Sequence, residues 1–326
     1  CGAASAWGAL PCARLTALYF DRRAEVPAAV VERLAWPQMR VLSGIALRAA
    51  DVEPLARGLP NLGRLCAYPV GSWARQPPDS PGFGSVTWAR LYDCCESFCA
   101  AARVGRVFPA AERLEWDSGC APIEADLTGL TRLTHLELYV AEGDGYAELR
   151  PRVWDALAAL TGLRHVALDV SREQLPRLAR LPAGVEALTV RVAHRIVDNE
   201  FLWWPDAGGG AFDACEVLDA AARAPGLTAL RFQAPGAALS HAGLARLVAA
   251  WPAAGAAARL SRLQVDAPAL RLHDIAALAM LPGLRALLVR PHPDICPSDP
   301  QLLALAAQHA AGGLQVSPVV GPMLQF

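Results

Sequence analysis

The chain has 326 residues, of which 54% are hydrophobic and 19% charged, and its formal net charge is −1. So much apolar material excludes an intrinsically disordered chain, and the near-zero charge argues against a nucleic-acid-binding protein, which needs a basic surplus. No uncharged apolar run reaches the length of about 18 residues that a membrane-spanning helix needs, so we expect no membrane insertion.

One short pattern recurs along the chain: an apolar residue, two variable ones, an apolar residue, one variable one and an apolar residue. Its alternation predicts short β-strands. The clear copies occupy residues 15–20, 62–67, 133–138, 163–168, 185–190, 227–232, 260–265 and 284–289. Weaker copies centre on Ile45, Val86, Leu114 and Leu314. Most copies follow one another at roughly 20–30 residues, the period of a repeat protein.

Between the strands, apolar residues recur at three- and four-residue spacing, which predicts amphipathic helices. These helices are expected over residues 150–160, 173–180, 214–224, 240–250, 272–280 and 300–310. Ser240 and Asp299, the latter before Pro300, are candidate N-caps. Gly162, Gly226 and Gly283 follow helices, where a left-handed turn would end each one.

Repeats of this form resemble the leucine-rich repeat family, and Leu239-Ser240-His241-Ala242-Gly243-Leu244 resembles the strand-to-helix turn of its ribonuclease-inhibitor-like subclass. The resemblance implies an α/β solenoid (horseshoe) over residues 1–326, with a parallel sheet of about twelve strands on the concave face and helices on the convex face. The family usually places Asn or Cys in the turn after each strand. Here Ala141, Ser171, Ala193 and Pro235 stand there, so we expect an irregular solenoid in which other groups or water satisfy the turns.

In such a fold the residues between the inward strand positions face the concave surface. They are predicted to be Tyr19, Arg48, Cys66, Tyr68, Thr87, Glu115, Asp117, Glu137, Tyr139, Asp169, Thr189, Arg191, Arg231, Gln233, Gln264, Asp266 and Arg290. Glu115, Asp117, Glu137 and Asp169 make the middle of this surface acidic, whereas Arg191, Arg231 and Arg290 make the later part basic. The charges are either a solvated face or a bipolar surface for a protein partner, and an acidic centre would repel RNA.

An aromatic loop is predicted at about 193–212, where Phe201, Leu202, Trp203 and Trp204 lie between charged and glycine-rich flanks. Adjacent tryptophans outside the repeat either fold back onto the solenoid or anchor a partner, since Trp is favoured in interface hot spots. Further long connections are expected at 71–84, 141–147 and 291–299, at the same edge of the sheet.

Nine cysteines at irregular spacing do not indicate a disulfide framework, and they predict reduced thiols in an intracellular compartment. Cys94, Cys95 and Cys99 are interpreted as buried helix cysteines, because a zinc site needs four ligands and only Cys120 is close in sequence. His292, Asp294 and Cys296 belong to a proline-rich turn rather than a metal site. We expect no cofactor, no metal and no catalytic residue, because none of the common catalytic motifs occurs.

These features predict a non-enzymatic scaffold for protein–protein interaction, a subunit of a larger assembly. The candidate contact residues are Phe201, Trp203, Trp204, Glu115, Asp117, Glu137, Tyr139, Asp169, Arg191 and Arg231. Two alternatives stay open: the substrate-recognition domain of an F-box ubiquitin ligase, and a leucine-rich repeat regulator of a GTPase or another enzyme. All 30 basic residues are Arg, so every cationic contact would be made by a guanidinium group.

Overall fold

The computed structural model describes residues 14–25, 36–73, 81–118, 122–124, 126–139, 149–192, 213–224, 226–233, 240–251, 259–291 and 295–318. The chain divides into two compact units, Cys1–Leu163 and Arg164–Phe326, called here the first and second unit. Both are built from repeated strands; within the described residues, helices follow every second strand in the first unit and each of the first five strands in the second.

The strands of the first unit lie in chain order and pair in parallel. They are β1 (Ala17–Glu25), β2 (Val41–Leu47), β3 (Arg64–Pro69), β4 (Trp88–Leu91), β5 (Arg113–Asp117) and β6 (His135–Tyr139). Its helices are η2 (Ala49–Asp51), α3 (Val52–Gly58), α4 (Glu96–Ala101), α5 (Val104–Val107) and α6 (Pro151–Ala159).

The second unit repeats this arrangement, again with parallel pairing in chain order. Its strands are β7 (His165–Val170), β8 (Ala187–Val192), β9 (Ala229–Gln233), β10 (Arg262–Leu270), β11 (Ala286–Pro291) and β12 (Gln315–Pro318). Its helices are η3 (Arg172–Arg180), α7 (Cys215–Ala222), α8 (His241–Ala250), α9 (Leu272–Ala279) and α10 (Pro300–Ala310).

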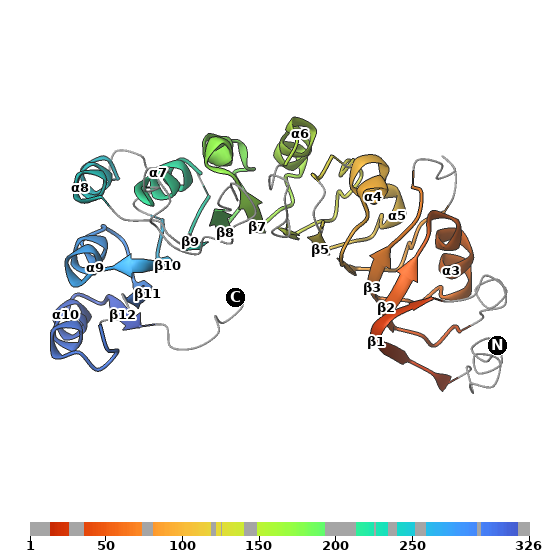
Figure 1. Ribbon diagram of the computed structural model, residues 1–326, viewed down its shortest axis with the longest axis horizontal. Coiled ribbons are helices and arrows are strands. Elements are labelled where there is room, and N and C mark those ends of the chain that lie inside the picture. Colours follow the sequence, from red (N-terminus) through yellow and green to blue (C-terminus); the bar gives the residue numbers. More distant parts are fainter. Residues whose placement is uncertain are drawn as a thin grey trace, which may run out of the picture. The chain divides into compact units, whose positions relative to one another are not determined.

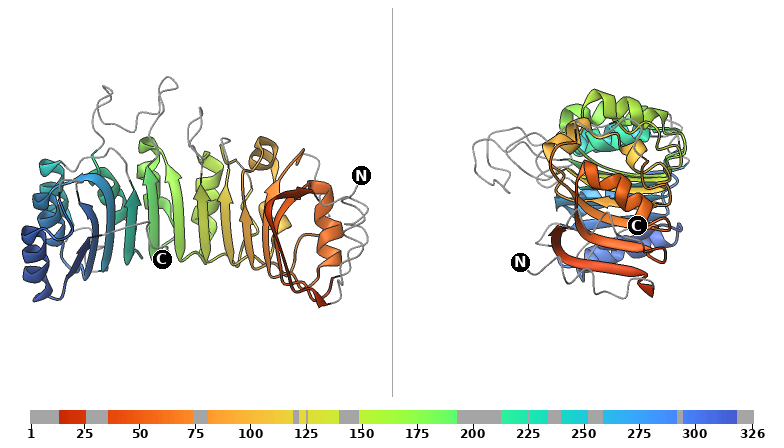
Figure 2. Two further views of the ribbon diagram at one scale, coloured as in Figure 1. Left: turned by 60° about the horizontal axis from the view of Figure 1, so that its bottom comes forward. Right: turned by 90° about the vertical axis from the view of Figure 1, so that its right-hand side faces the viewer.

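In each unit the helices lie on one face of the sheet, and within the described ranges no helix covers the other face (Figure 1; Figure 2). We call this other face the open face. The fold is an α/β leucine-rich repeat solenoid, as the sequence predicts. Because a strand turns alternate side chains to opposite faces, every second strand residue is buried beneath the helices and its neighbours lie on the open face.

The pairing register corrects three of the weaker repeats. Leu42, Ala89 and Val316 align with the middle leucines of the other strands, not Ile45, Val86 and Leu314. In β2 the shift has a structural cause, because Gly44 (φ 84°) sits at an irregularity in the pairing. The aligned positions of the first unit, Leu18, Leu42, Leu65, Ala89, Leu114 and Leu136, then follow one another at 24, 23, 24, 25 and 22 residues.

The predicted helices are confirmed within one or two residues at each end, with one change of type. Residues 172–180 form a 3₁₀ helix, which contains Pro176. Proline lacks the N–H that an α-helix interior needs, so the tighter turn is favoured there. Both N-caps are confirmed: the Ser240 hydroxyl accepts from Gly243 N, and the Asp299 carboxylate accepts from Gln301 N.

The three glycines that follow helices differ in the structural reason that favours glycine at each position. Only Gly283 adopts the predicted left-handed conformation, with φ 81°. At Gly226 a Cβ atom would lie 2.0 Å from the carbonyl oxygen of Ala183, so glycine is needed for the close approach of two backbones. At Gly162 the same atom would lie 3.2 Å from the oxygen of Leu133, a milder contact.

In the described part of the chain, three turns are satisfied by side chains three residues further on, whereas Ala141, Ala193 and Pro235 lie outside the described residues. After β2 the N–H of Arg48 donates to Asp51 Oδ2 at 3.2 Å, and after β10 the N–H of Arg271 donates to Asp274 Oδ2 at 2.9 Å. After β7 the N–H of Ser171 donates to Gln174 Oε1 at 3.4 Å. Asp51, Gln174 and Asp274 are all buried, so at these turns a side chain takes the place of the usual turn residue, as predicted for Ser171.

Candidate functional site

The open face of the first unit carries three rows of side chains that run across strands β3 to β6. The strand register places four residues in each row. The strand-start row is Arg64, Trp88, Arg113 and His135; the middle row is Cys66, Arg90, Glu115 and Glu137; the strand-end row is Tyr68, Tyr92, Asp117 and Tyr139. Tyr92 follows the last residue of β4 and lies beside Asp117. Neighbours within a row belong to adjacent strands about 4.8 Å apart, so their side chains touch.

Trp88 organises the strand-start row. The guanidinium carbon of Arg64 lies 3.5 Å from the centre of the Trp88 ring, and that of Arg113 lies 4.9 Å from it. These arginines come from the strands on either side of β4, and each gains a cation–π contact. The indole Nε1–H donates to Glu115 Oε1 at 2.9 Å, which fixes the orientation of the ring.

Glu115 is the hub of the middle row and is only 4% exposed. Besides the indole it accepts from Arg113 Nε at 2.8 Å and pairs with Arg90 Nε at 3.0 Å. Arg113 also forms an ion pair with Glu137, in which its Nη2 lies 2.8 Å from Glu137 Oε1. A buried carboxylate is tolerated when it is paired and fully hydrogen-bonded, and here two arginines and one indole provide that.

Tyrosines dominate the strand-end row. The rings of Tyr68 and Tyr92 stack at 5.3 Å and 28°, and the Arg90 guanidinium lies 4.7 Å from the centre of the Tyr92 ring. Tyr139 donates its hydroxyl hydrogen to Glu137 Oε2. Burial raises the pKa of the Tyr92 phenol above its usual value, although Arg90 opposes the shift, so this hydroxyl is protonated at neutral pH.

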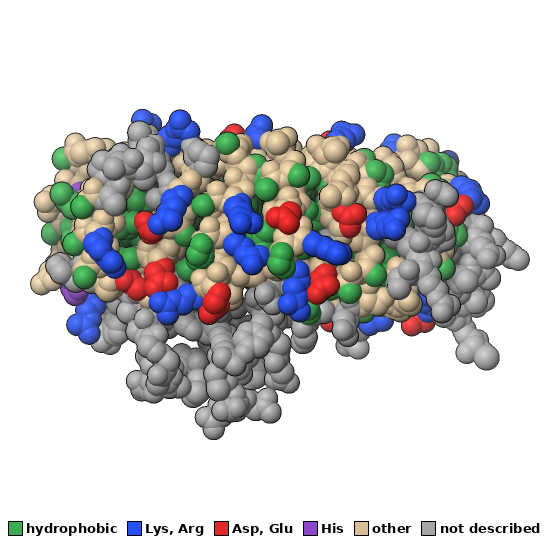
Figure 3. Space-filling view, turned by 90° about the horizontal axis from the view of Figure 1, so that it is seen from above, with side chains coloured by type: hydrophobic (Ala, Val, Ile, Leu, Met, Phe, Trp, Pro, Cys, Tyr) green, Lys and Arg blue, Asp and Glu red, His purple; other side chains and the backbone are tan. Residues whose placement is uncertain are grey.

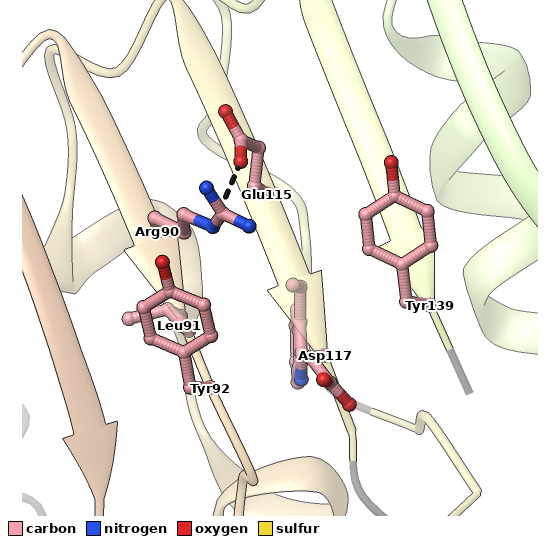
Figure 4. A pocket seen from close by; sticks show the side chains of 7 residues that line it. Arg90, Leu91, Tyr92, Glu115, Asp117 and Tyr139 are labelled. Atoms are coloured by element: carbon pink, nitrogen blue, oxygen red, sulfur yellow. Dashed lines mark ion pairs between the residues drawn. The ribbon is translucent and has the colours of Figure 1, made fainter. Parts of the chain in front are cut away.

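A small hollow opens in this row, with Tyr92 and Tyr139 on its two sides (Figure 4). Asp117 lies between the two tyrosines, and the Arg90–Glu115 ion pair borders the hollow toward the middle row (Figure 4). Leu91 and Trp116 complete the lining. The hollow therefore combines aromatic, cationic and anionic groups within one small space.

The open face of the second unit carries ion pairs, other polar side chains and small residues. Arg191 Nε pairs with Asp169 Oδ1 at 2.5 Å, and Arg290 Nε pairs with Asp266 Oδ1 at 3.0 Å. Their neighbours on this face include Ala187, Ala229 and Ala286. Elsewhere on the molecule, exposed pairs such as Arg172–Glu216 join helices, and Figure 3 shows side chains of both signs interspersed rather than gathered by sign.

The predicted contact residues fall into three groups. Glu115, Asp117, Glu137 and Tyr139 lie together on the open face of the first unit. Asp169, Arg191 and Arg231 lie on the open face of the second. Phe201, Trp203 and Trp204, with the whole 193–212 loop, lie outside the described residues, so their role stays a prediction.

The expected acidic middle is wrong in its electrostatics. The carboxylates of Glu115, Glu137 and Asp169 face the predicted side, but arginines of neighbouring strands balance them. The basic later section is likewise offset, because Asp169 and Asp266 pair with two of its three arginines. Two further positions are corrected: Thr87 precedes β4, and Arg48 lies in the turn after β2, where it pairs with Glu25 at 3.2 Å.

The residues that sequence reasoning missed are Arg64, Trp88, Arg90, Tyr92 and Arg113. Two errors hid them. The strand-start row was left out of the predicted surface, and the repeat centred on Val86 put Thr87 where the register places Arg90. Two features in the sequence could have found them: Trp88-Ala89-Arg90-Leu91 itself alternates, and its middle residue Ala89 restores the spacing of about 24 residues.

The prediction of a buried helix cysteine is confirmed for Cys99, which lies in α4, whereas Cys94 is buried but precedes that helix. Burial raises the pKa of the Cys94 thiol well above its usual value, so it is an unreactive thiol. Cys95 caps α4 rather than lying within it, and Cys120 lies outside the described residues. Within the described ranges, no three His, Cys, Asp or Glu side chains come together as a metal site. Cys296 is exposed, whereas His292 and Asp294 are not described.

Neither the protein families nor the curated proteins compared with the chain gave a match. Among solved structures the chain is similar to one described as "Crystal structure of TLR13-ssRNA13 complex", with 13% sequence identity and a TM-score of 0.42. The similarity covers 94% of this chain and 40% of that one. The parallel pairing of the strands in chain order is the topology of an α/β solenoid. No helix in the described part of the chain is long and apolar enough to cross a membrane.

Proposed function

We propose that the chain is a non-enzymatic recognition protein that binds another protein through the open face of its first unit. The observation that supports this is the network of Trp88, Arg64, Arg90, Arg113 and Glu115. It concentrates the residue types that dominate interface hot spots, and it holds them in one arrangement before any partner arrives.

Burial supports the same reading. Apart from Glu115, these side chains are only partly buried, so each keeps accessible area for a partner. Stability alone would not require aromatic rings on a face that no helix covers, because the apolar core lies on the other side of the sheet. An open face with tryptophan, tyrosine and arginine is therefore better explained by contact with another molecule.

Three finer features belong to this proposal. The chain would be a subunit of a larger assembly, with Trp203 and Trp204 as a second set of anchors. It would form one continuous solenoid of the ribonuclease-inhibitor-like subclass, which the one-helix repeats at α8, α9 and α10 support. Its ligand would be a protein rather than a nucleic acid, because carboxylates are interspersed among the arginines of the open face.

The test is co-purification from a cell lysate with the tagged full chain as bait, measured by quantitative mass spectrometry. We expect Trp88→Ala to lose proteins that the unaltered chain retains. Arg223→Ala, which breaks an exposed pair with Asp219 on helix α7, is the matched control and should retain them. A variant Trp88→Ala that folds normally and retains the same proteins would contradict the proposal.

A further inference from the structure

Arg64 differs from the other arginines of the network. Arg90 and Arg113 each pair with a carboxylate at 3.0 Å or less. No acidic residue in the described part of the chain pairs with Arg64, whose one close partner there is the Trp88 ring at 3.5 Å. Its Nε atom is buried and has no hydrogen-bond partner among the described residues. Arg64 is therefore the one arginine of this network whose charge no described carboxylate balances.

The guanidinium of Arg64 is also held in place. It lies on one side of Trp88, and the indole Nε1–H is fixed by Glu115 Oε1. A guanidinium that is already stacked loses little further rotamer freedom when its fork binds an anion. Since Arg64 is only partly buried, the outer nitrogens of the fork are the part open to a ligand.

We propose that Arg64, stacked on Trp88, is the anchor for a carboxylate side chain of the protein partner. A carboxylate matches the planar fork of the guanidinium with two parallel hydrogen bonds. This inference rests on the proposed function and names the chemistry that the partner must present at that point of the open face.

The charges around Arg64 favour a single carboxylate over a phosphate backbone. Glu115 and Glu137 lie on the two strands beyond Trp88, and Asp117 ends the first of them. A strand of phosphates laid across the rows would meet these carboxylates, whereas one acidic side chain at Arg64 would not. Nucleic-acid affinity comes mainly from repeated phosphate contacts, whereas in the three rows across β3 to β6 both other arginines, Arg90 and Arg113, are already paired with carboxylates.

The test uses the full chain and a fluorescein-labelled hexaglutamate peptide, followed by fluorescence anisotropy at low ionic strength. Arg64→Gln removes both the charge and the fork, and should weaken binding about tenfold. Arg64→Lys keeps the charge without the fork, and should weaken it about threefold. Arg57→Gln is the matched control: it removes the same charge from α3, where Arg57 is exposed and paired with Glu53, and should leave binding unchanged.

Four results would overturn the proposal. They are no binding of hexaglutamate by the unaltered chain, equal binding by Arg64→Gln, an equal loss in Arg57→Gln, and tighter Arg64-dependent binding of a labelled octauridylate than of hexaglutamate. The last would assign the site to nucleic acid. The lysate experiment separates this inference from the proposed function: proteins lost with Trp88→Ala but retained with Arg64→Gln would leave the function standing and remove the carboxylate anchor.

Discussion

The open faces of the two units differ in what their repeats place on them. In the first unit, Trp88 and Glu115 each contact two arginines, so charges and rings form one connected network. In the second unit Arg191 pairs with Asp169 and Arg290 pairs with Asp266, among alanines and threonine. The same repeat therefore builds both sheets, while among the described strands it is the first unit that places tryptophan and tyrosine rings beside arginines on its open face.

This difference separates the residues that make the fold from those that make the surface. Inward leucines recur at matching register positions in the strands of both units. The open-face residues are not needed for that register, so they are free to differ. Variants in both units can therefore test which contributions to stability the two units share and which differ.

The largest effect on the free energy of unfolding is expected where two backbone segments approach closely at a glycine, which happens in both units. Gly105 in the first unit and Gly226 in the second each lie where a Cβ atom would meet a backbone carbonyl oxygen, at 2.1 and 2.0 Å. Alanine at either position should lower the free energy of unfolding by about 3 kcal/mol, since backbone must move. Gly84→Ala, whose added atom meets nothing within 4 Å, is the control for urea denaturation. Equal midpoints for all three variants would refute the close approach.

The next effect contrasts the two kinds of ion pair. Glu115→Gln should lower the free energy of unfolding by about 2 kcal/mol, because two arginines and the Trp88 indole depend on this buried carboxylate. Asp169→Asn, which removes the carboxylate paired with Arg191, should cost about 1 kcal/mol. Urea unfolding of both variants measures the difference, and an effect of Asp169→Asn larger than that of Glu115→Gln would reverse the comparison.

Two carboxylates, one in each unit, are expected to make the stability of the protein depend on pH in opposite directions, with a smaller effect. Although burial opposes it, hydrogen bonds from Ser240 and Cys215 hold the pKa of Asp213 below its usual value of 3.8. Asp213 thus contributes stability above pH 3.8 that is lost as the pH falls through its lowered pKa. Burial raises the pKa of Asp51 above 3.8, so its contribution is present below pH 3.8 and is lost as the pH rises through the raised pKa.

The two asparagine variants therefore have opposite pH profiles. Going up in pH, Asp213→Asn should lose stability relative to the unaltered chain, with a final deficit of about 1 kcal/mol, whereas Asp51→Asn should gain relative to it. Thermal unfolding between pH 3 and 7 measures both differences. Parallel pH profiles for the two variants would contradict the opposite pKa shifts of the two carboxylates.

The smallest effect on the free energy of unfolding is expected for an ion pair that joins two helices. Arg172 and Glu216 pair at 2.5 Å, but both side chains are well exposed, 54% and 41%. Exposed pairs contribute little because water screens them, so Arg172→Ala should change the free energy of unfolding by less than about 0.5 kcal/mol. A loss above 1 kcal/mol would place this pair among the structural elements of the second unit.

The strands and helices could be predicted from sequence because their signal repeats. An inward leucine is required in every strand, so copies such as 133–138 and 163–168 support one another. The network around Trp88 could be predicted less well, because each of its members comes from a different strand. Its contacts depend on register, and an error of three residues at Val86 was enough to replace Arg90 with Thr87. The pairing of Glu115 with Arg113 and Arg90 could then not be seen, and the surface was predicted to be acidic.

The most direct test of the central claim, that the first unit carries the recognition surface, is hydroxyl-radical footprinting of the full chain with and without a co-purified partner. Four side chains on the open face of the first unit react readily with hydroxyl radicals: Trp88, Tyr68, Tyr92 and Tyr139. Met280, which is 64% exposed in the second unit, serves as an internal reference. Binding should protect the four aromatic residues and leave Met280 unchanged. Protection of Met280 together with unchanged oxidation of Trp88 would contradict the account.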